Sequence, residues 1–369
     1  FMVIQESGTV ESYIHYLLHI FRSSPALLPV VLFVLMACAT TFLSVGYEYI
    51  PLIPILIIIF SRMGYDSLFV VGLVCIAQGI GWGAGVTSPL NTQIAQQVAE
   101  VPLGDGLLFR LQFFLVLLAG GILFLRSYAR HNKKETIAPM TLGTLDVRQE
   151  PEASDVGLTK KHILIGLVAA VLFTIILYAV QTMGWGVIEM TGGFLAVGVC
   201  TIFISGMSGT TAMNAMVKGI EAMIVPALIV GVARAIQVIL FEGQVVDTML
   251  FHTADFLRQQ HGLVATIGMF VFQGVLNFFI PSASGQALVT MPLLVPLSDI
   301  LGLSRNVTVF AFIIGDGLSN LIIPTNGYLL AILGLAGIPF EKWFKFILPF
   351  FLFTVVAGVS FLILAYYTL

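Results

Sequence analysis

The stretch Ser88-Pro89-Leu90-Asn91-Thr92 interrupts an otherwise apolar segment with polar residues and a proline, and Ile323-Pro324-Thr325-Asn326 does the same near the end of the chain. Other landmarks keep the same spacing. Pro51 corresponds to Pro292 at an offset of 241 residues, and the prolines of the two interruptions lie 235 residues apart. Proline-interrupted apolar segments at matching places in two halves are the best sequence sign of the binding site of a secondary transporter. The pattern predicts transport and not soluble chemistry.

The chain has the composition of a helical membrane protein. Of its 369 residues, 58% are hydrophobic and 9% are charged, and the mean hydropathy is +1.03. A soluble domain has about a quarter of its residues charged. The longest runs that are nearly free of charge reach the roughly 20 residues that a helix needs to cross the hydrocarbon, whereas a β-barrel would show weak alternation. We therefore expect an all-α polytopic membrane protein embedded in the lipid bilayer.

A basic segment divides the chain into two membrane halves. Of the 16 Lys and Arg residues, seven lie between Arg126 and Lys161, where a nucleic-acid patch would be the alternative. Positive charges gather in the cytoplasmic loops of membrane proteins, and topology explains this segment better. We predict a first half over residues 1–125, a cytoplasmic linker over 126–161 and a second half over 162–369. The opening residues resemble the tail of a membrane helix, so we expect the first half to be N-terminally incomplete.

Each half is expected to hold one re-entrant helical hairpin and one interrupted transmembrane helix. The apolar pieces Tyr49–Phe60 and Ala287–Leu301 are short and are expected to be hairpin arms, which predicts the two hairpins near residues 40–62 and 277–301. The helix breaks are expected near residues 88–92 and 323–327. Basic residues follow the closing helix of the first half but precede that of the second, so equivalent helices would run in opposite directions. The sequence thus predicts two inverted structural repeats.

Polar side chains gather at the interruptions. Broken helices are tolerated in a membrane only where protein or a water-filled cavity surrounds them, which predicts one shared interior site. Hydroxyl and amide groups suit a hard cation such as sodium, and helix N-termini suit a carboxylate. The alternative is that these side chains only hydrogen-bond one helix to another. The predicted substrate-binding residues are Ser88, Asn91, Thr92, Ser282, Ser284, Gly285, Gln286, Thr325 and Asn326.

Asp316 is the clearest ionisable candidate. A carboxylate within a membrane span costs several kcal/mol unless it is partnered or hydrated, so it marks an ion or proton pathway by default. A structural pair with an arginine is the alternative. Glu48 could take part in coupling or be an exposed charge at the hairpin end. The predicted coupling-ion residues are Glu48, Asn91, Ser284, Asp316, Asn320 and Asn326, with Na⁺ or a proton as the ion and no other metal or cofactor.

The chain lacks the common motifs of enzymes that use nucleotides or metals. It has no P-loop, HExxH or GxSxG pattern, so ATP-driven transport and hydrolysis lack support, and we expect a carrier and not an enzyme. The glycines at positions 79, 81, 83 and 85 form two overlapping GxxxG patterns. They predict close helix packing more than phosphate binding.

Several motifs resemble a known family. Residues 277–286, Asn-Phe-Phe-Ile-Pro-Ser-Ala-Ser-Gly-Gln, resemble the hallmark of the YfcC-like branch of the anaerobic C4-dicarboxylate carrier (DcuC) family. The Gly-Asp-Gly-Leu-Ser-Asn of residues 315–320 and the Tyr-Ile-Pro-Leu-Ile-Pro of residues 49–54 fit that family too. The resemblance covers the chain outside the linker. Gly46-Tyr47-Glu48-Tyr49 is a departure, because it has no secure counterpart in the family.

The resemblance implies a bacterial inner-membrane protein of the wider ion-transporter superfamily. Such a protein would form a homodimer with scaffold and transport domains and use elevator-type alternating access. We expect a sodium- or proton-coupled transporter of small carboxylate-bearing metabolites such as C4-dicarboxylates, with an anionic or zwitterionic metabolite as its ligand and no nucleic-acid partner. The alternatives are an antiporter of amino acids, including basic ones, a carrier of peptide-like metabolites, and a membrane sensor or channel.

Overall fold

The computed structural model describes the chain apart from residues 1, 11, 14–15, 17–25, 133–157 and 184–186. The described residues are helical and include no β-strand. Among them, three helical runs are long and apolar enough to cross a membrane, as judged by length and composition: Ser67–Val98, Leu107–Asn132 and Phe340–Thr368. An all-α membrane protein is therefore confirmed at this level.

The elements before the linker surround two short irregular helices, the 3₁₀-helix η2 and the single π-helical turn η3. The bounds are α1 Met2–Glu6, α3 Leu27–Leu43, η2 Tyr47–Leu52, α4 Ile53–Arg62, α5 Ser67–Ala84, η3 Pro89–Gln93, α6 Ile94–Val98 and α7 Leu107–Asn132.

The elements after the linker begin with two helices, α8 and α9, that lie largely apart from the central helices. The bounds are α8 Lys160–Met183, α9 Val187–Ser205, α10 Gly209–Glu242, α11 Val245–Arg258, α12 Gly262–Leu276, α13 Ala283–Ile300, α14 Arg305–Ser319, α15 Gly327–Ala336 and α16 Phe340–Thr368.

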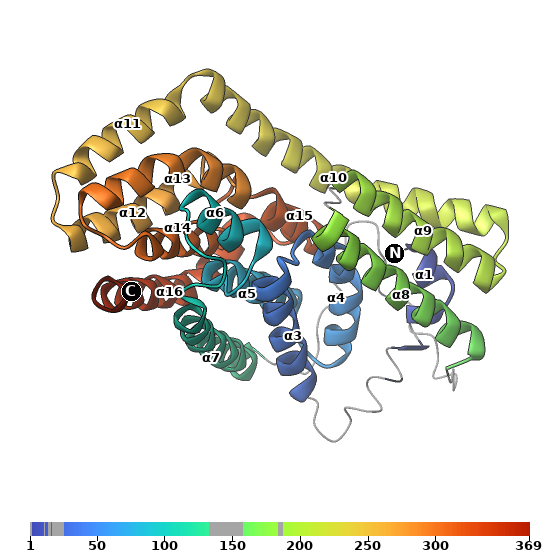
Figure 1. The fold of residues 1–369 in the computed structure, drawn as a ribbon. Coiled ribbons are helices and arrows are strands. Elements are labelled where there is room, and N and C mark those ends of the chain that lie inside the picture. The colour runs from blue at the N-terminus through green and yellow to red at the C-terminus, as the bar shows by residue number, and fades with distance from the viewer. Residues whose placement is uncertain (1, 11, 14–15, 17–25, 133–157, 184–186) are drawn as a thin grey trace.

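Helices α5 and α14 form the centre of the molecule (Figure 1). Every residue of α14 from Val307 to Ser319 is buried, and α3 packs on α5 as α12 packs on α14. The two central helices cross so closely that a Cβ atom at Gly317 would collide with the backbone of Trp82 and Gly83. Gly81 meets Thr40 of α3 in the same way. The predicted packing role of these glycines is confirmed.

Several boundaries differ from those expected from sequence. Helix α7 continues through Arg126 to Asn132, because basic residues in the last turn interact favourably with the helix dipole. Helix α13 continues across Pro292 and Pro296, since neighbouring helices can compensate for interior prolines in a membrane protein. Most of the predicted linker lies outside the described residues.

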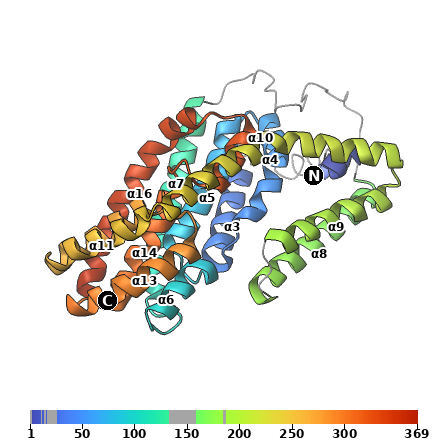
Figure 2. The same cartoon turned by 90° about the horizontal axis from the view of Figure 1, so that it is seen from above.

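Helices α8 and α9 lie side by side at one end of the molecule, next to α1 (Figures 1 and 2). From there α10 runs across the central helices to α11, and it contacts α15 on the way. This group has many exposed apolar side chains, among them Phe203, Ile220 and Leu228. Such side chains are expected where lipid or another protein surface covers a helix.

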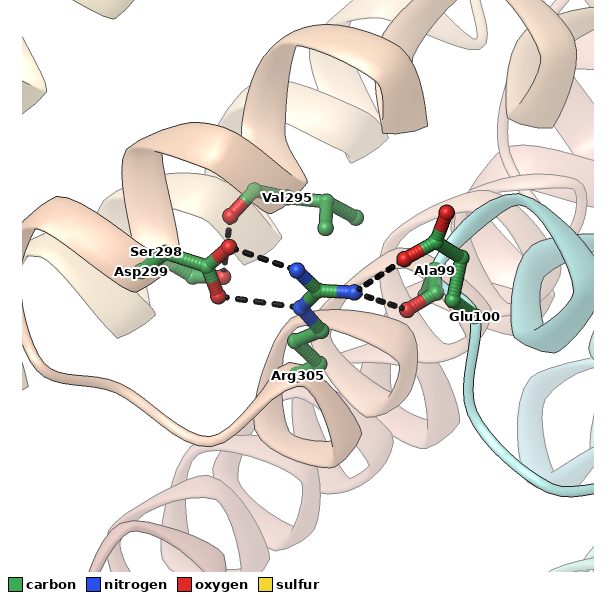
Figure 3. A network of polar contacts seen from close by, with 6 residues as sticks. All are labelled: Ala99, Glu100, Val295, Ser298, Asp299 and Arg305. Atoms are coloured by element: carbon green, nitrogen blue, oxygen red, sulfur yellow. Dashed lines mark hydrogen bonds and ion pairs between the residues drawn. The ribbon is translucent and has the colours of Figure 1, made fainter.

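Arg305, the first residue of α14, connects the two halves at one end of the molecule (Figure 3). Its Nε and Nη2 atoms donate to the Asp299 carboxylate at 3.0 and 2.8 Å. Its Nη1 atom donates to the Glu100 carboxylate and to the Ala99 carbonyl, both at 3.0 Å. The guanidinium thus links the end of α13 to the segment that follows α6.

Candidate functional site

A cavity of about 160 Å³ lies between the first and second halves of the chain. Residues of η2, α5 and η3 form one side, and residues at the starts of α13 and α15 form the other. Ser282, Ser284, Asn320 and Asn326 are the predicted site residues that the structure brings to its wall. The full lining is Tyr47, Gln78, Trp82, Leu90, Pro281, Ser282, Ala283, Ser284, Asn320, Asn326 and Tyr328.

Two helices begin at this cavity, each with a polar N-cap. The Ser282 hydroxyl accepts from the Gly285 amide at 3.4 Å at the start of α13. The Asn326 Oδ1 atom accepts from the amides of Tyr328 and Leu329 at 3.0 and 3.4 Å at the start of α15. Serine and asparagine are favoured at this position because their side chains satisfy amides that have no partner within the helix. The caps thus place two helix N-termini, with their partial positive charge, at one cavity.

The second helix break is held to the residues that follow α12 by side-chain hydrogen bonds. Asn277 Nδ2 donates to the Asp316 carbonyl at 2.8 Å and to Asn320 Oδ1 at 3.1 Å. Asn326 Nδ2 donates to the same Asn320 oxygen at 2.9 Å, and the Thr325 hydroxyl donates to the Phe278 carbonyl at 2.7 Å. Thr325 therefore fastens the break and does not line the cavity.

Asp316 lies in the middle of α14 and is completely buried. Its Oδ2 atom accepts from Asn91 Nδ2 at 3.4 Å, so the carboxylate of one half meets the helix break of the other. No arginine pairs with it among the described residues. Within the same residues, the Oδ1 atoms of Asp316 and Asn91 both lack a hydrogen-bond partner. The site therefore holds a buried carboxylate without a compensating charge in the described part of the chain.

The first break is satisfied by the chain itself. The Ser88 hydroxyl lies 2.6 Å from that of Ser44, which also accepts from the Leu90 amide at 3.2 Å. The Thr92 hydroxyl donates to the Gly85 carbonyl. Neither Ser88 nor Thr92 lines the cavity. Their part in substrate binding stays a prediction.

Arg110 of α7 completes this arrangement and was missed by the sequence reasoning. Its side chain is 3% exposed, and its Nε and Nη2 atoms both donate to the Val86 carbonyl at 3.2 Å. Its Nη1 atom donates to the Asp105 carbonyl at 2.8 Å. An arginine at the start of an apolar helix was the signal that could have singled it out.

Glu48 and Gln286 are buried behind the cavity. Glu48 is 5% exposed and accepts from the Gly46 amide at 2.7 Å, so it is not the exposed hairpin-end charge that was the alternative. Gln286 Nε2 donates to Gln273 at its carbonyl and Oε1 atoms, at 2.8 and 2.6 Å. This amide pair joins α12 to α13. Gly285 contributes its amide to the Ser282 cap.

Aromatic residues of the wall were also missed. The rings of Tyr47 and Tyr328 meet edge to face with centroids 5.7 Å apart. The Trp82 Nε1 and Tyr328 hydroxyl groups are buried without a hydrogen-bond partner among the described residues. The sequence did hold a signal for Trp82 as a wall residue. Gln78 and Trp82 lie one helical turn apart among the glycines of α5, so both can face the same side of the helix.

Comparison with known proteins supports a carrier. The profile of the family described as "C4-dicarboxylate anaerobic carrier" (DcuC) matches residues 1–367. The chain is 30% identical over 364 residues to the "Putative basic amino acid antiporter YfcC" of Escherichia coli K12, covering 94% of this chain and 71% of that protein. A Haemophilus influenzae protein is 29% identical over 325 residues, and the match covers 86% of this chain and 63% of that protein.

The fold has a counterpart among solved structures. The YdaH transporter of Alcanivorax borkumensis aligns with a TM-score of 0.53 at 16% identity, over 98% of this chain and 82% of that one. At this identity the likeness concerns the fold alone. The family match over nearly the whole chain, together with the resemblance carried by residues 277–286, identifies the sequence. The chain belongs to the C4-dicarboxylate anaerobic carrier family.

Proposed function

We propose that this carrier is an ion-coupled secondary active transporter that holds the carboxylate of a small metabolite, such as a C4-dicarboxylate, in the cavity of about 160 Å³. The observation that carries the proposal is the meeting of two helix N-termini, capped by Ser282 and Asn326, at the wall of that cavity. The partial positive charge of the two helix N-termini favours an anion there. No lysine or arginine is among the lining residues, so the backbone would supply the positive charge.

We assign the coupling ion to the neighbourhood of Asp316 and Asn91. A buried carboxylate without a compensating charge is unfavourable by several kcal/mol. A proton on Asp316 would remove this charge, and a sodium ion would compensate for it while using the two Oδ1 atoms that lack hydrogen bonds. Asn91 stands at the first break, and Asn320 and Asn326 stand at the second, so the ion would couple to the same segments that hold the substrate.

The element order and contacts support two inverted repeats, α3–α7 and α12–α16. Each has a pair of helices that would form a re-entrant hairpin, then a buried helix with a break, then a closing helix. The contacts are reciprocal, because α4 packs on α15 and α6 packs on α13. Each proposed hairpin thus contacts the second part of the other repeat's broken helix.

We place the protein in the bacterial cytoplasmic membrane as a homodimer, with residues 126–161 on the cytoplasmic side. The separate position of α8 and α9 supports a division into scaffold and transport domains, as elevator-type alternating access requires. The exposed apolar side chains of these helices would face lipid or the second copy.

An antiporter of basic amino acids is the second candidate. The Escherichia coli relative carries that description. The wall of the cavity also offers the rings of Tyr47, Trp82 and Tyr328, whose faces attract cations. Glu48, directly after Tyr47 in the chain, would add a buried carboxylate behind them.

The variant Asn326→Asp separates the two candidates. Aspartate is as good an N-cap as asparagine, and it adds a negative charge to the cavity. It also loses the hydrogen bonds that the Asn326 amide donates to Asn320, so melting temperature is measured beside transport. We expect counterflow of a C4-dicarboxylate in proteoliposomes to fall by roughly tenfold or more, since like charges at short range repel by more than about 1 kcal/mol. Binding of arginine or lysine would instead strengthen if the second candidate holds.

The matched control is Ser304→Asp. Ser304 caps α14 by accepting from the Asn306 amide at 3.2 Å, and it does not line the cavity. The Ser304→Asp variant adds the same negative charge at another N-cap position, but outside the cavity. Its dicarboxylate counterflow should therefore equal that of the unmodified protein. If Asn326→Asp and Ser304→Asp transport dicarboxylates equally well, the carboxylate does not bind at the start of α15.

A further inference from the structure

A second cavity, of about 310 Å³, lies between α3, α5 and α7, away from the proposed substrate site. Most of its wall is apolar and includes Pro29, Phe33, Phe69 and Leu125. Its lining also includes two basic residues of α7, Arg126 and Arg130. The cavity therefore combines an apolar surface with two cationic groups.

The two arginines lack an anionic partner within the described part of the chain. They are four residues apart on one helix, both are exposed, and no ion pair involves either of them. Like charges at this spacing destabilise a helix. Asp66 lies next to the cavity residue Tyr65, but its carboxylate is already used.

Asp66 is occupied by two hydrogen bonds. Its Oδ2 atom accepts from the Tyr128 hydroxyl at 2.7 Å, and its Oδ1 atom accepts from the Phe69 amide at 2.8 Å, where it caps α5. These two hydrogen bonds fix the position of the Asp66 carboxylate at the start of α5. The charge of Arg126 and Arg130 is thus left for a ligand.

The position of the pair along α7 indicates what that ligand is. The helix is apolar from Leu111 to Leu125, and the basic residues follow immediately. In a helix that crosses a membrane, this change falls where hydrocarbon gives way to lipid headgroups. Basic pockets between transmembrane helices at this level suit anionic headgroups, and guanidinium groups bind phosphate in a bidentate manner.

We infer that the cavity between α3, α5 and α7 binds an anionic phospholipid, with its phosphate on Arg126 and Arg130 and an acyl chain along the apolar wall. A free phosphate ion would use the guanidinium groups but leave the apolar surface unfilled. A zwitterionic lipid such as phosphatidylcholine would fill the wall, but its own ammonium group would repel the two arginines and offset the attraction of its phosphate. Only a ligand with both parts matches the whole cavity.

The test uses the full chain purified in detergent. Its melting temperature would be measured with added phosphatidylglycerol, phosphatidylcholine or inorganic phosphate, and lipid binding would be quantified by native mass spectrometry. We expect phosphatidylglycerol alone to raise the melting temperature, because a ligand that binds only the folded state stabilises it. Equal stabilisation by phosphatidylcholine, or full reproduction of the effect by inorganic phosphate, would overturn the inference.

Variants assign the effect to the arginines. The double variant Arg126→Gln and Arg130→Gln should bind phosphatidylglycerol roughly 30-fold more weakly, since each basic side chain near an anionic headgroup contributes a factor of about five. The control is Lys342→Gln with Lys345→Gln, which removes two exposed charges at the start of α16 without touching the cavity. Unchanged binding in the arginine variant, or equal loss in the control, would contradict the site.

A third variant guards against misfolding. Arg126→Lys with Arg130→Lys keeps both charges and loses the planar forks that bind phosphate in a bidentate manner. We expect its phosphatidylglycerol binding to fall between that of the unmodified protein and the glutamine variant. The contrary outcome is a lysine variant that binds no phosphatidylglycerol while its melting temperature without lipid is unchanged. That result would overturn the inference that the positive charges at positions 126 and 130 are the main attraction for the lipid.

Discussion

The two helix breaks of this carrier are built differently, although their sequences look alike. At the first break, Ser44, Thr41 and Arg110 bind the freed backbone groups of residues 85–90, so the segment is closed by its own surroundings. At the second break, Asn326 caps α15 at the wall of a cavity, and Asn320 lines the same wall. The first break is held mainly by neighbouring side chains, whereas the helix that follows the second break starts at the cavity wall.

This difference teaches how similar motifs divide two tasks. A closed break fixes the position of the chain and contributes to stability, because its buried polar groups all need partners. At an open break, the partial positive charge of the helix N-terminus would favour an anion in the cavity. Asp316 lies between the two, since it stands in α14 and touches Asn91 of the first break. Changes at Ser44 or Arg110 should therefore lower stability, whereas changes at the cavity wall or at the contact between Asp316 and Asn91 should lower transport.

Removing the charge of Asp316, which lies between the two breaks, should have the largest effect on transport. We expect Asp316→Asn to abolish the dependence of uptake on the coupling ion, because the side chain keeps its shape and loses its charge. Stability should not fall, since a buried charge without compensation is itself unfavourable. Sodium and pH titrations of uptake and of melting temperature measure both. The control is the exposed Asp255→Asn. Uptake that keeps its full ion dependence would remove Asp316 from coupling.

The largest loss of stability is expected at the first break. Arg110→Met leaves the Val86 and Asp105 carbonyls without their donor, and it should lower the free energy of unfolding by about 3 kcal/mol. Thermal or chemical denaturation in detergent measures it. Arg258→Gln in α11, which is exposed, should leave stability unchanged. A melting temperature that stays at the value of the unmodified protein would mean that the first break does not depend on Arg110.

A matched pair of serines sharpens the comparison further. Ser44→Ala should cost about 1–2 kcal/mol of stability, because Ser88 and the Leu90 amide lose a buried partner, while substrate affinity stays the same. Ser284→Ala at the cavity wall should weaken substrate binding and leave stability unchanged. Melting temperature and counterflow would be measured for both. The opposite pattern would reverse the roles of the two regions.

The smallest effect is expected at Arg305, the half-exposed first residue of α14 that contacts both halves. Its guanidinium holds the pKa of Asp299 below the ordinary value of 3.8. A carboxylate with a lowered pKa stabilises the fold above its ordinary pKa, and this stabilisation is lost as the pH falls through the lowered value. Arg305→Gln should therefore lower the melting temperature slightly at pH 7, and less at high salt. Its difference from the unmodified protein should shrink below pH 3.8. A difference that does not depend on pH would rule out the ion pair as its cause.

The sequence predicted the class of fold but only part of the site. Composition predicted a helical membrane protein. Of the predicted site residues, Ser282, Ser284, Asn320 and Asn326 do line the cavity. Ser88 and Thr92 did not, because a sequence pattern cannot tell whether a hydroxyl faces a cavity or a neighbouring carbonyl. The rings of Tyr47 and Tyr328 could not be paired from sequence either, since 281 positions separate them and only the packing of the halves brings them together.

The crossing of α5 and α14 at Gly83 and Gly317 has a mechanical consequence. Because the two backbones touch with no side chain between them, neither helix can slide or rotate against the other without a collision. Helix α5 leads into the first break and helix α14 leads into the second. The two breaks are therefore attached to one rigid pair of crossed helices. The close contact predicts that Asp316, Asn91 and the adjoining parts of the two helices keep their relative positions in any conformational change of this carrier.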